Sequence, residues 1–191
     1  TEKVKTGEFT PIIKKEIKKH KYDLILMGFE KECYLYYRLL EEVDIPVWIE
    51  AKSDSKKILS VCSNLAPNEK VPNIRTELSE KLSWNLNILY ILDKEDTVIV
   101  DKKGKRSDKK DESDLIKESL GFYEYMKEKG IEIEVIKGKI EKETIKKAKK
   151  INANLVIVGR EQKKKGMLGF PIKNLKRKLA EKCEYSLLFI N

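Results

Sequence analysis

The sequence is poor in the side chains on which most catalytic and metal sites depend. Its 191 residues include one histidine and three cysteines, and Cys33, Cys62 and Cys183 lie far apart with no C-x-x-C pair. A structural zinc site needs four ligands at short spacings, and a histidine-dependent triad has only His20 to draw on. We therefore expect no metal cluster, no disulfide framework and no enzymatic activity, with the thiols in the core and His20 on the surface.

Long apolar runs are also missing. The runs 24–27 and 187–190 are far shorter than the roughly 20 residues that a membrane helix needs, and the N-terminal residues show no signal-peptide pattern. We expect no membrane insertion and a cytoplasmic location. Apolar residues still make up 40% of the chain, which is enough for a folded core.

Charge is abundant, and most of it is lysine and glutamate. The chain has 41 Lys and Arg against 32 Asp and Glu, a net charge of +9. Lysine mixed with glutamate on helices is typical of a solvated surface, whereas nucleic-acid grooves more often combine arginine with exposed aromatic residues. We therefore do not expect nucleic acid as the partner. Two basic clusters would be its candidate surfaces: Lys102, Lys103, Lys105, Arg106, Lys109 and Lys110, and Lys163–Lys165 with Lys173, Lys176, Arg177 and Lys178.

Two segments of the sequence are related by an offset of 131 residues. VKTGEFTPIIKKEIKKHKYDLILMG, ending at Gly28, aligns with VIKGKIEKETIKKAKKINANLVIVG, ending at Gly159. Each segment predicts a short strand closed by glycine, a lysine-rich helix and a continuously apolar strand of the kind buried in parallel sheets. The helices carry apolar faces at Phe9, Ile13 and Ile17, and at Ile140, Thr144, Ala148 and Ile151.

After each closing glycine the pattern continues with a helix and a final strand. These are residues 34–43 and 46–49 in the first copy, and 172–183 and 186–190 in the second. The second copy also has a front half, which predicts strands at 57–62 and 86–92, an edge strand at 97–100, a lysine-rich loop at 101–113, and helices at 67–83 and 114–129. The helix at 114–129 is apolar at Ile116, Leu120 and Tyr123, and Gly130 is expected to end it. This alternation predicts a doubly wound α/β sheet with right-handed crossovers.

That order of elements resembles the universal stress protein (UspA-like) family. In the first copy the likeness is carried by GEFTPIIKKEIKKHKYDLILMG and EEVDIPVWIE. The resemblance implies a five-stranded parallel sheet in the order 3-2-1-4-5 with helices on both faces. Residues 57–191 would form one complete domain, residues 1–50 the back half of a second and residues 51–56 the linker. Many members of the family bind ATP or another adenine nucleotide. The resemblance therefore implies a regulatory or sensing module that binds a nucleotide and is not an enzyme.

In the family the nucleotide lies at the carboxyl ends of the first and fourth strands. An acidic residue there contacts the adenosine, and a turn beginning G-x-x-G wraps the phosphates. Here the acidic position falls on Ser63, and the turn keeps Gly159 but has no glycine three residues later. Loop 163–169 is thus either a phosphate-binding nest or a solvated basic loop. The resemblance implies a weak site lined by Ser63, Asn64, Asp93, Gly159, Arg160, Lys165, Gly166 and Asn174, with Asp93 able to reach a ribose hydroxyl.

The first copy is incomplete. Seventeen residues separate Gly28 from Pro46, against 26 between Gly159 and Ser186, and the copy has no first strand. The strand at 24–27 would then present an unpaired apolar edge. Val4–Thr6 could fill the gap, a second copy of the chain could cover it in a homo-oligomer, or the chain could be a fragment whose upstream domain covers it. We favour the last interpretation.

Members of the family often join through their last strands. The resemblance implies that residues 47–49 pair antiparallel with residues 187–190, with Trp48 either at this seam or filling the core. If the nucleotide site is degenerate, the function of the chain would be to form this strand pairing. A scaffold or dimerisation module is therefore the alternative function, and a basic nucleic-acid-binding surface is a weaker third.

Overall fold

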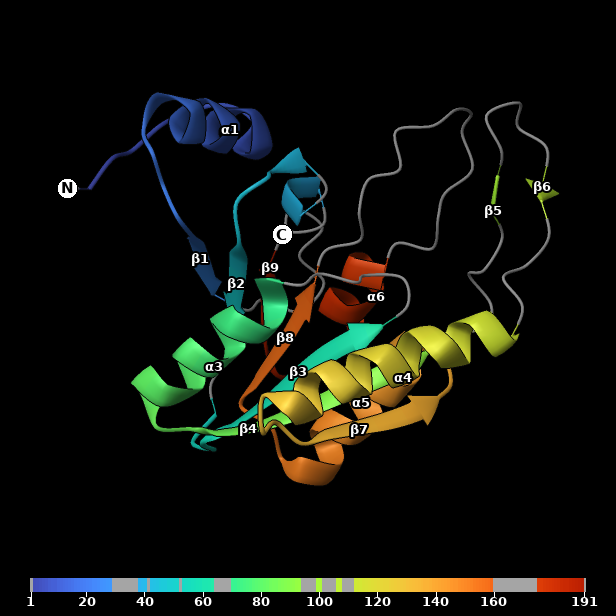
Figure 1. Ribbon diagram of the computed structural model, residues 1–191. Coiled ribbons are helices and arrows are strands. Elements are labelled where there is room, and N and C mark those ends of the chain that lie inside the picture. Colours follow the sequence, from blue (N-terminus) through green and yellow to red (C-terminus); the bar gives the residue numbers. More distant parts are fainter. Residues whose placement is uncertain are drawn as a thin grey trace.

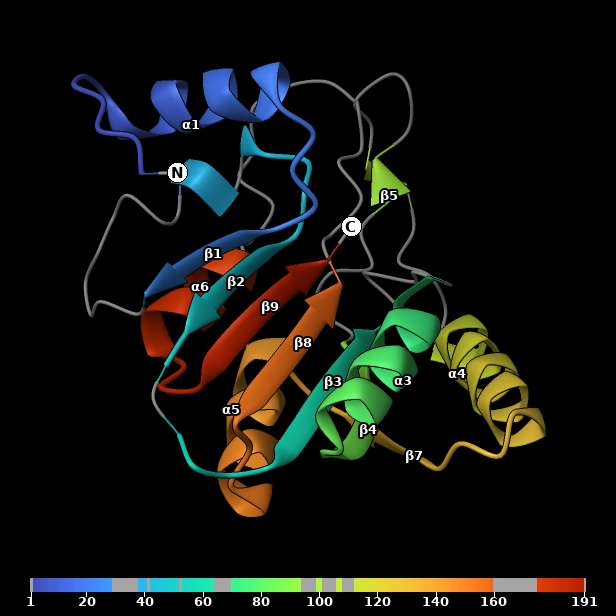
Figure 2. The same ribbon diagram turned by 90° about the vertical axis from the view of Figure 1, so that its left-hand side faces the viewer.

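The centre of the molecule is a seven-stranded sheet in the order β1-β2-β9-β8-β3-β4-β7 (Figures 1 and 2). The computed structural model describes residues 2–28, 38–40, 42–51, 53–63, 70–93, 99–100, 106–107, 112–159 and 175–190. The strands of the sheet are β1 (Ile25–Gly28), β2 (Val47–Glu50), β3 (Lys57–Ser63), β4 (Asn85–Leu92), β7 (Ile133–Lys137), β8 (Leu155–Gly159) and β9 (Ser186–Ile190).

The five strands of residues 57–191 confirm the predicted parallel sheet. Every neighbouring pair among β7, β4, β3, β8 and β9 is parallel, and counted along the chain their order is 3-2-1-4-5. Helices α3 (Lys70–Leu82) and α4 (Glu112–Glu128) lie on one face, and α5 (Ile140–Ile151) and α6 (Leu175–Lys182) on the other (Figure 2). The result is a three-layer α/β arrangement.

Burial explains why the central strands are apolar without alternation. All residues of β8 and β9 are buried, because each strand packs against side chains on both faces of the sheet. Leu59 and Val156 belong to the cluster that includes Ile140 and Ala148 of α5. Leu155 and Ile157 face the opposite way and pack with Leu78 of α3 and with Trp84.

The first copy joins this sheet as two further strands. β1 pairs parallel with β2, with Ile25 opposite Val47. β2 pairs antiparallel with β9, with Trp48 opposite Leu188, which is the arrangement expected for the closing strands. Helix α1 (Phe9–Lys19) packs Ile13 and Ile17 against the main core, and residues 38–40 are helical. The sheet is therefore continuous across the repeat.

The short strand expected at Val4–Thr6 is absent. Residues 2–6 have no regular secondary structure, and Val4 is 96% exposed. In the second copy the equivalent strand β7 exists because β4 lies beside it, and the first copy has no counterpart of β4. Val4–Thr6 therefore does not cover β1, and that alternative is wrong.

Helix α4 buries a different face from the one expected. We predicted that Ile116, Leu120 and Tyr123 would face the core, but Leu120 is 53% and Tyr123 is 40% exposed. The buried face carries Leu115, Ser119 and Met126, with Phe122 packed beside Tyr90 at a ring-centroid distance of 5.0 Å. Since the helix carries apolar residues on two sides, hydrophobic spacing alone did not decide which side faces β4.

The predicted stop of this helix at Gly130 is confirmed. Gly130 has φ +69°, a left-handed conformation that glycine adopts without a steric penalty. The backbone N–H of Ile131 donates to the carbonyl oxygen of Met126 at 2.9 Å, and that of Gly130 donates to Lys127 at 2.9 Å. These two bonds satisfy the last carbonyl groups of the helix and turn the chain toward β7.

The segment after β4 differs from the predicted edge strand and loop. β5 (Ile99–Val100) pairs antiparallel with β6 (Arg106–Ser107) in a separate two-stranded sheet. It therefore does not extend the main sheet, whose edge beside β4 is taken by β7. The lysine-rich stretch 101–113 contains β6 and the first residues of α4, so it is not a continuous loop.

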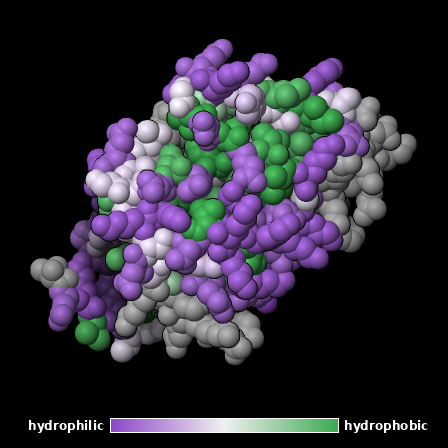
Figure 3. Space-filling model, turned by 90° about the horizontal axis from the view of Figure 1, so that it is seen from below, coloured by the Kyte–Doolittle hydropathy of each residue, from purple (hydrophilic) through white to green (hydrophobic). Residues whose placement is uncertain are grey.

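The surface is charged, as the composition predicts. Seen from below, hydrophilic side chains cover most of the face and apolar ones lie in patches among them (Figure 3). Lysine and glutamate pair across neighbouring elements, including Lys147 with Glu134 and Lys182 with Glu141. The first pair joins α5 to β7 and the second joins α6 to α5.

Two buried polar residues hold the segment between the copies against the sheet. Asn154 is 5% exposed, and its Nδ2 donates to the carbonyl oxygens of Ser53 at 3.0 Å and Ser55 at 2.7 Å. Ser186 Oγ accepts from the backbone N–H of Ala51 and donates to its carbonyl oxygen, both at 2.9 Å. The connection between the copies is thus fixed by hydrogen bonds.

Replacing Asn154 by alanine should lower the free energy of unfolding by about 1–2 kcal/mol, because the buried amide loses two hydrogen bonds to the connecting segment. Asp23 is the equivalent residue of the first copy and is exposed, so Asp23→Ala should change stability by less than about 0.5 kcal/mol. Urea unfolding followed by tryptophan fluorescence measures both. Equal effects of the two substitutions would contradict this role of Asn154.

Candidate functional site

The carboxyl ends of β4, β3 and β8 lie together at one end of the sheet, across the strands and not along an outer strand. β3 is flanked by β4 on one side and by β8 on the other, so the chain order reverses between β3 and β8 (Figure 1). Ligands of doubly wound sheets bind outside the carboxyl ends of the strands at such a reversal. This position is the candidate site.

Three of the predicted site residues lie together at this end of the sheet. Val61 pairs with Val158, which places Ser63 at the end of β3 beside Gly159 at the end of β8. Ser63 is 3% exposed, and Gly159 is buried opposite Ile190 of β9. Asp93 follows the last residue of β4 and is 7% exposed. The structure therefore brings Ser63, Asp93 and Gly159 to the carboxyl ends of three neighbouring strands.

The remaining predicted residues lie outside the described residues. They are Asn64, Arg160, Lys165, Gly166 and Asn174. The lysine cluster of loop 163–165 falls in the same stretch, so the choice between a phosphate nest and a solvated basic loop stays a prediction.

Asp93 also has a structural role that the sequence did not reveal. Its Oδ2 accepts a hydrogen bond from the backbone N–H of Ile140 at 3.1 Å. Ile140 opens α5, and the N-cap residue Lys139 makes no side-chain cap bond. A carboxylate at a helix N-terminus satisfies a free N–H and interacts favourably with the helix dipole. One oxygen of Asp93 thus holds the start of α5 beside the candidate site.

Two buried hydroxyl groups have no hydrogen-bond partner among the residues that the structure describes. They are Ser60 Oγ, in the middle of β3, and Thr144 Oγ1, on the sheet-facing side of α5. Thr144 occupies the apolar face predicted for its helix, with Ile140 and Ala148. Both side chains lie within the packed layers, so we assign them to the core and not to the site.

The reactive side chains predicted to be structural lie away from solvent or away from the site. Cys62 and Cys183 are buried, and neither forms a disulfide within the described residues. Burial raises the pKa of the Cys183 thiol to about 11, so it stays protonated at neutral pH. His20 is exposed after the end of α1, beside Glu16. Cys33 lies outside the described residues.

In the described ranges, no group of three or more His, Cys, Asp or Glu side chains is placed to hold a metal ion. Within the same ranges no helix is both long enough and apolar enough to cross a membrane.

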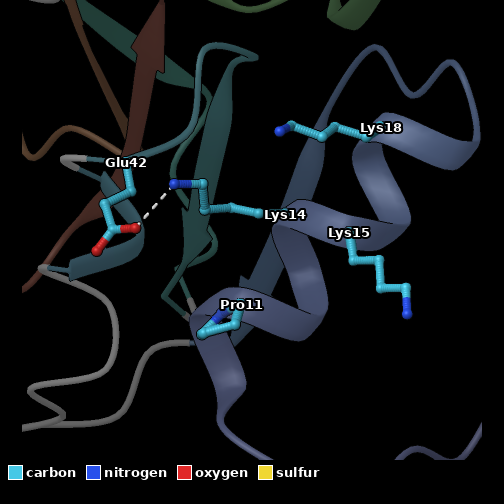
Figure 4. Close-up of a pocket in the computed structure, with 5 residues that line it drawn as sticks. All are labelled: Pro11, Lys14, Lys15, Lys18 and Glu42. Carbon is cyan, nitrogen blue, oxygen red and sulfur yellow. Dashed lines mark hydrogen bonds and ion pairs between the residues drawn. The ribbon is translucent and has the colours of Figure 1, made fainter.

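A hollow of about 350 Å³ lies elsewhere, on the first copy (Figure 4). It is lined by Pro11, Lys14, Lys15, Lys18 and Glu42. Lys14 Nζ reaches Glu42 Oε2 at 2.9 Å, while Lys15 points away from Glu42 (Figure 4). Hydrogen bonds from Lys14 and Arg38 lower the pKa of the Glu42 carboxyl. The Lys14–Glu42 pair ties α1 to the segment around residues 38–42, so the hollow is a by-product of this packing.

The pairing of Lys3 and Lys5 with Glu16 has a similar structural effect at the N-terminus. Both ammonium groups contact the Glu16 carboxylate, and their hydrogen bonds lower its pKa to about 2. The N-terminal segment therefore follows α1 and does not run along β1.

Three solved structures share the fold over nearly the whole chain. A protein described as a universal stress protein, from Pseudomonas aeruginosa UCBPP-PA14, matches with a TM-score of 0.70 and 12% identity, covering 97% of this chain and 69% of its own. A functionally unknown protein from Pseudomonas aeruginosa PAO1 matches with a TM-score of 0.67 and 12% identity, and the match covers 97% of this chain and 68% of that protein. A universal stress protein from Archaeoglobus fulgidus DSM 4304 matches with a TM-score of 0.60 and 16% identity, and the match covers 95% of this chain and 65% of that protein.

These structures establish the fold, and the likeness goes no further than the fold at such identities. No family model matches the sequence, and neither does any curated protein. The chain therefore has the α/β fold seen in universal stress proteins, as its sequence predicts. About a third of each neighbour lies outside the matched part.

Replacing Asp93 by alanine should lower the free energy of unfolding by about 1 kcal/mol, because α5 loses its N-terminal cap. Asp93→Asn keeps an oxygen that can accept from Ile140 N–H and should recover most of the loss. Asp114→Ala, in the exposed first turn of α4, is the matched control. Urea midpoints compare the three, and an asparagine variant as unstable as the alanine variant would contradict the capping role.

Proposed function

We propose that this protein is a non-enzymatic regulatory or sensing module that binds an adenine nucleotide weakly at the carboxyl ends of β3 and β8. The observation that carries the proposal is the placement of Ser63 beside Gly159 at the reversal of strand order. The fold shared with universal stress proteins supports the same position.

The residues at this end of the sheet suit an anionic ligand of modest affinity. Gly159 has no side chain, so a phosphate group can approach the backbone that leaves β8. A net charge of +9 favours the approach of polyphosphates. Ser63 stands where the family has an acidic residue, and a neutral hydroxyl makes a weaker hydrogen bond to a ribose or base than a carboxylate does. We therefore expect weak binding.

The same residues offer little for catalysis. One Asp93 oxygen is engaged by α5, and His20 follows α1 in the first copy. General base catalysis needs a titratable group within hydrogen-bond reach of the attacking water. We propose that a bound nucleotide leaves unchanged, so the chain would report nucleotide levels without consuming them.

A matched pair of glycine substitutions tests the proposal. Gly159→Val fills the backbone approach at the candidate site, whereas Gly28→Val adds the same side chain at the equivalent position of the first copy, where a Cβ meets nothing within 4 Å. If the dissociation constant is about 0.1 mM, 1 mM ATP should stabilise the chain by about 1.4 kcal/mol and raise Tm by roughly 3–5 °C. The Gly28→Val variant should keep this shift and the Gly159→Val variant should lose it.

Differential scanning fluorimetry with ATP, AMP and cyclic nucleotides measures the shift, and native mass spectrometry of freshly purified protein detects a retained ligand. Folding of both variants is checked by circular dichroism. If no nucleotide shifts Tm at millimolar concentration and none is retained, the nucleotide proposal is wrong.

That result would favour the alternative of a scaffold or dimerisation module. The observation in its favour is the antiparallel β2–β9 seam, in which Val47, Ile49, Leu187 and Phe189 are almost completely buried.

A further inference from the structure

The two edges of the seven-stranded sheet are protected very differently. β7, at one edge, carries Glu134 and Lys137, which pair with Lys147 and Glu112. β1, at the other edge, has no charged residue from Leu24 to Gly28. Leu24 is 43% and Leu26 is 67% exposed. Charged residues keep an exposed edge from pairing with another chain, and an apolar edge invites such pairing.

The backbone of β1 is also available on its outer side. The Ile25 N–H donates to the carbonyl oxygen of Pro46 at 3.0 Å, on the side of β2. In a parallel strand the main-chain groups of successive residues point to opposite sides. Those of Leu26 therefore face outward, where no further strand lies among the described residues. A hydrogen-bonding ladder and an apolar side chain are presented together.

The repeat shows how this edge is covered in the second copy. At the offset of 131 residues, Leu24 and Leu26 correspond to Leu155 and Ile157. Both of these residues are 0% exposed. β3 lies parallel to β8, with Ile58 opposite Leu155. On the same face, Leu155 and Ile157 pack in one cluster with Leu78 of α3 and with Trp84. One strand and one helix together bury the equivalent positions.

We propose that the edge of β1 binds a half-unit supplied by a polypeptide outside this 191-residue chain. Its first strand would add parallel to β1 through the main chain of Leu26. Its following helix would cover Leu24 and Leu26 as α3 covers Leu155 and Ile157. The partner is thus a strand–helix segment whose strand is apolar on both faces and whose helix is apolar on one. This inference does not depend on nucleotide binding.

A second copy of this chain fits the edge less well. Among the described strands, β3, β4 and β8 are apolar on both faces, and each already has a neighbouring strand on both sides. Antiparallel pairing of two β1 strands would satisfy the main chain but would bring no helix over Leu24 and Leu26. About a third of each neighbour of known structure also lies outside the matched part, which is enough for a half-unit.

The test uses the complete chain alone and an extended chain. In the repeat, Val4 corresponds to Val135. The extended chain therefore carries a duplicate of residues 53–134 directly before Val4. The duplicate then meets Val4 in the same way as residue 134 meets Val135 in the original chain. Hydrogen exchange of the Leu26 amide, measured by NMR, is the readout. We expect exchange at least about 100-fold slower in the extended chain than in the original. Light scattering should show the original chain to be a monomer.

Leu26→Lys and Val135→Lys are the matched variants, one for each edge. In the extended chain, Leu26→Lys should restore fast exchange at residues 25 and 27, and Val135→Lys of β7 should not. Two results would overturn the proposal. One is a Leu26 amide that exchanges equally fast in both chains. The other is an original chain that dimerises and becomes monomeric when Leu26 is replaced by lysine.

Discussion

The antiparallel pairing of β2 with β9 is the interaction on which the rest of the structure depends. Each closing strand ends one copy of the repeat, and Trp48 lies opposite Leu188 where they meet. Val47, Phe189 and Leu187 are completely buried there, so the seam is part of the core and not a surface contact. It joins a half-unit that has too few strands to stand alone to a complete five-stranded unit. Trp48 accordingly lies at the seam and also packs against the core.

This seam fixes where every other feature lies. Since β9 pairs with β8 on its other side, the candidate site between β3 and β8 lies one strand away from the seam. β1 is pushed to the far edge, beyond β2. The segment between the copies must cross the sheet end beside β9, and Ser186 and Asn154 hold it there. The strands of the first copy are therefore held by β9 on one side, and on the other side of β1 the described part of the chain places no strand.

Most of the fold could be predicted from the sequence because the repeat and the apolar strands are local signals. β9 has the predicted bounds, and β3 and β4 differ from prediction by one residue at an end. The errors have a common cause. The strand at Val4–Thr6 depends on a neighbour that the first copy lacks, and the buried face of α4 depends on Tyr90 across the layer. Neither neighbour is visible in a local pattern.

The candidate site was predictable in position but not in detail. Ser63 and Gly159 could be named from the resemblance to the universal stress protein motif, whereas the cap that Asp93 provides for Ile140 requires the meeting of two distant segments.

Nuclear Overhauser contacts across the seam test the account most directly. In deuterated protein with protonated Hα positions, alternate pairs of the β2–β9 register should show strong Hα–Hα contacts, as antiparallel strands do. They are expected at Trp48–Leu188, or at Val47–Phe189 and Ile49–Leu187. If neither set is present, or if β2 shows contacts only to β1, the two copies do not share a sheet and the account is wrong.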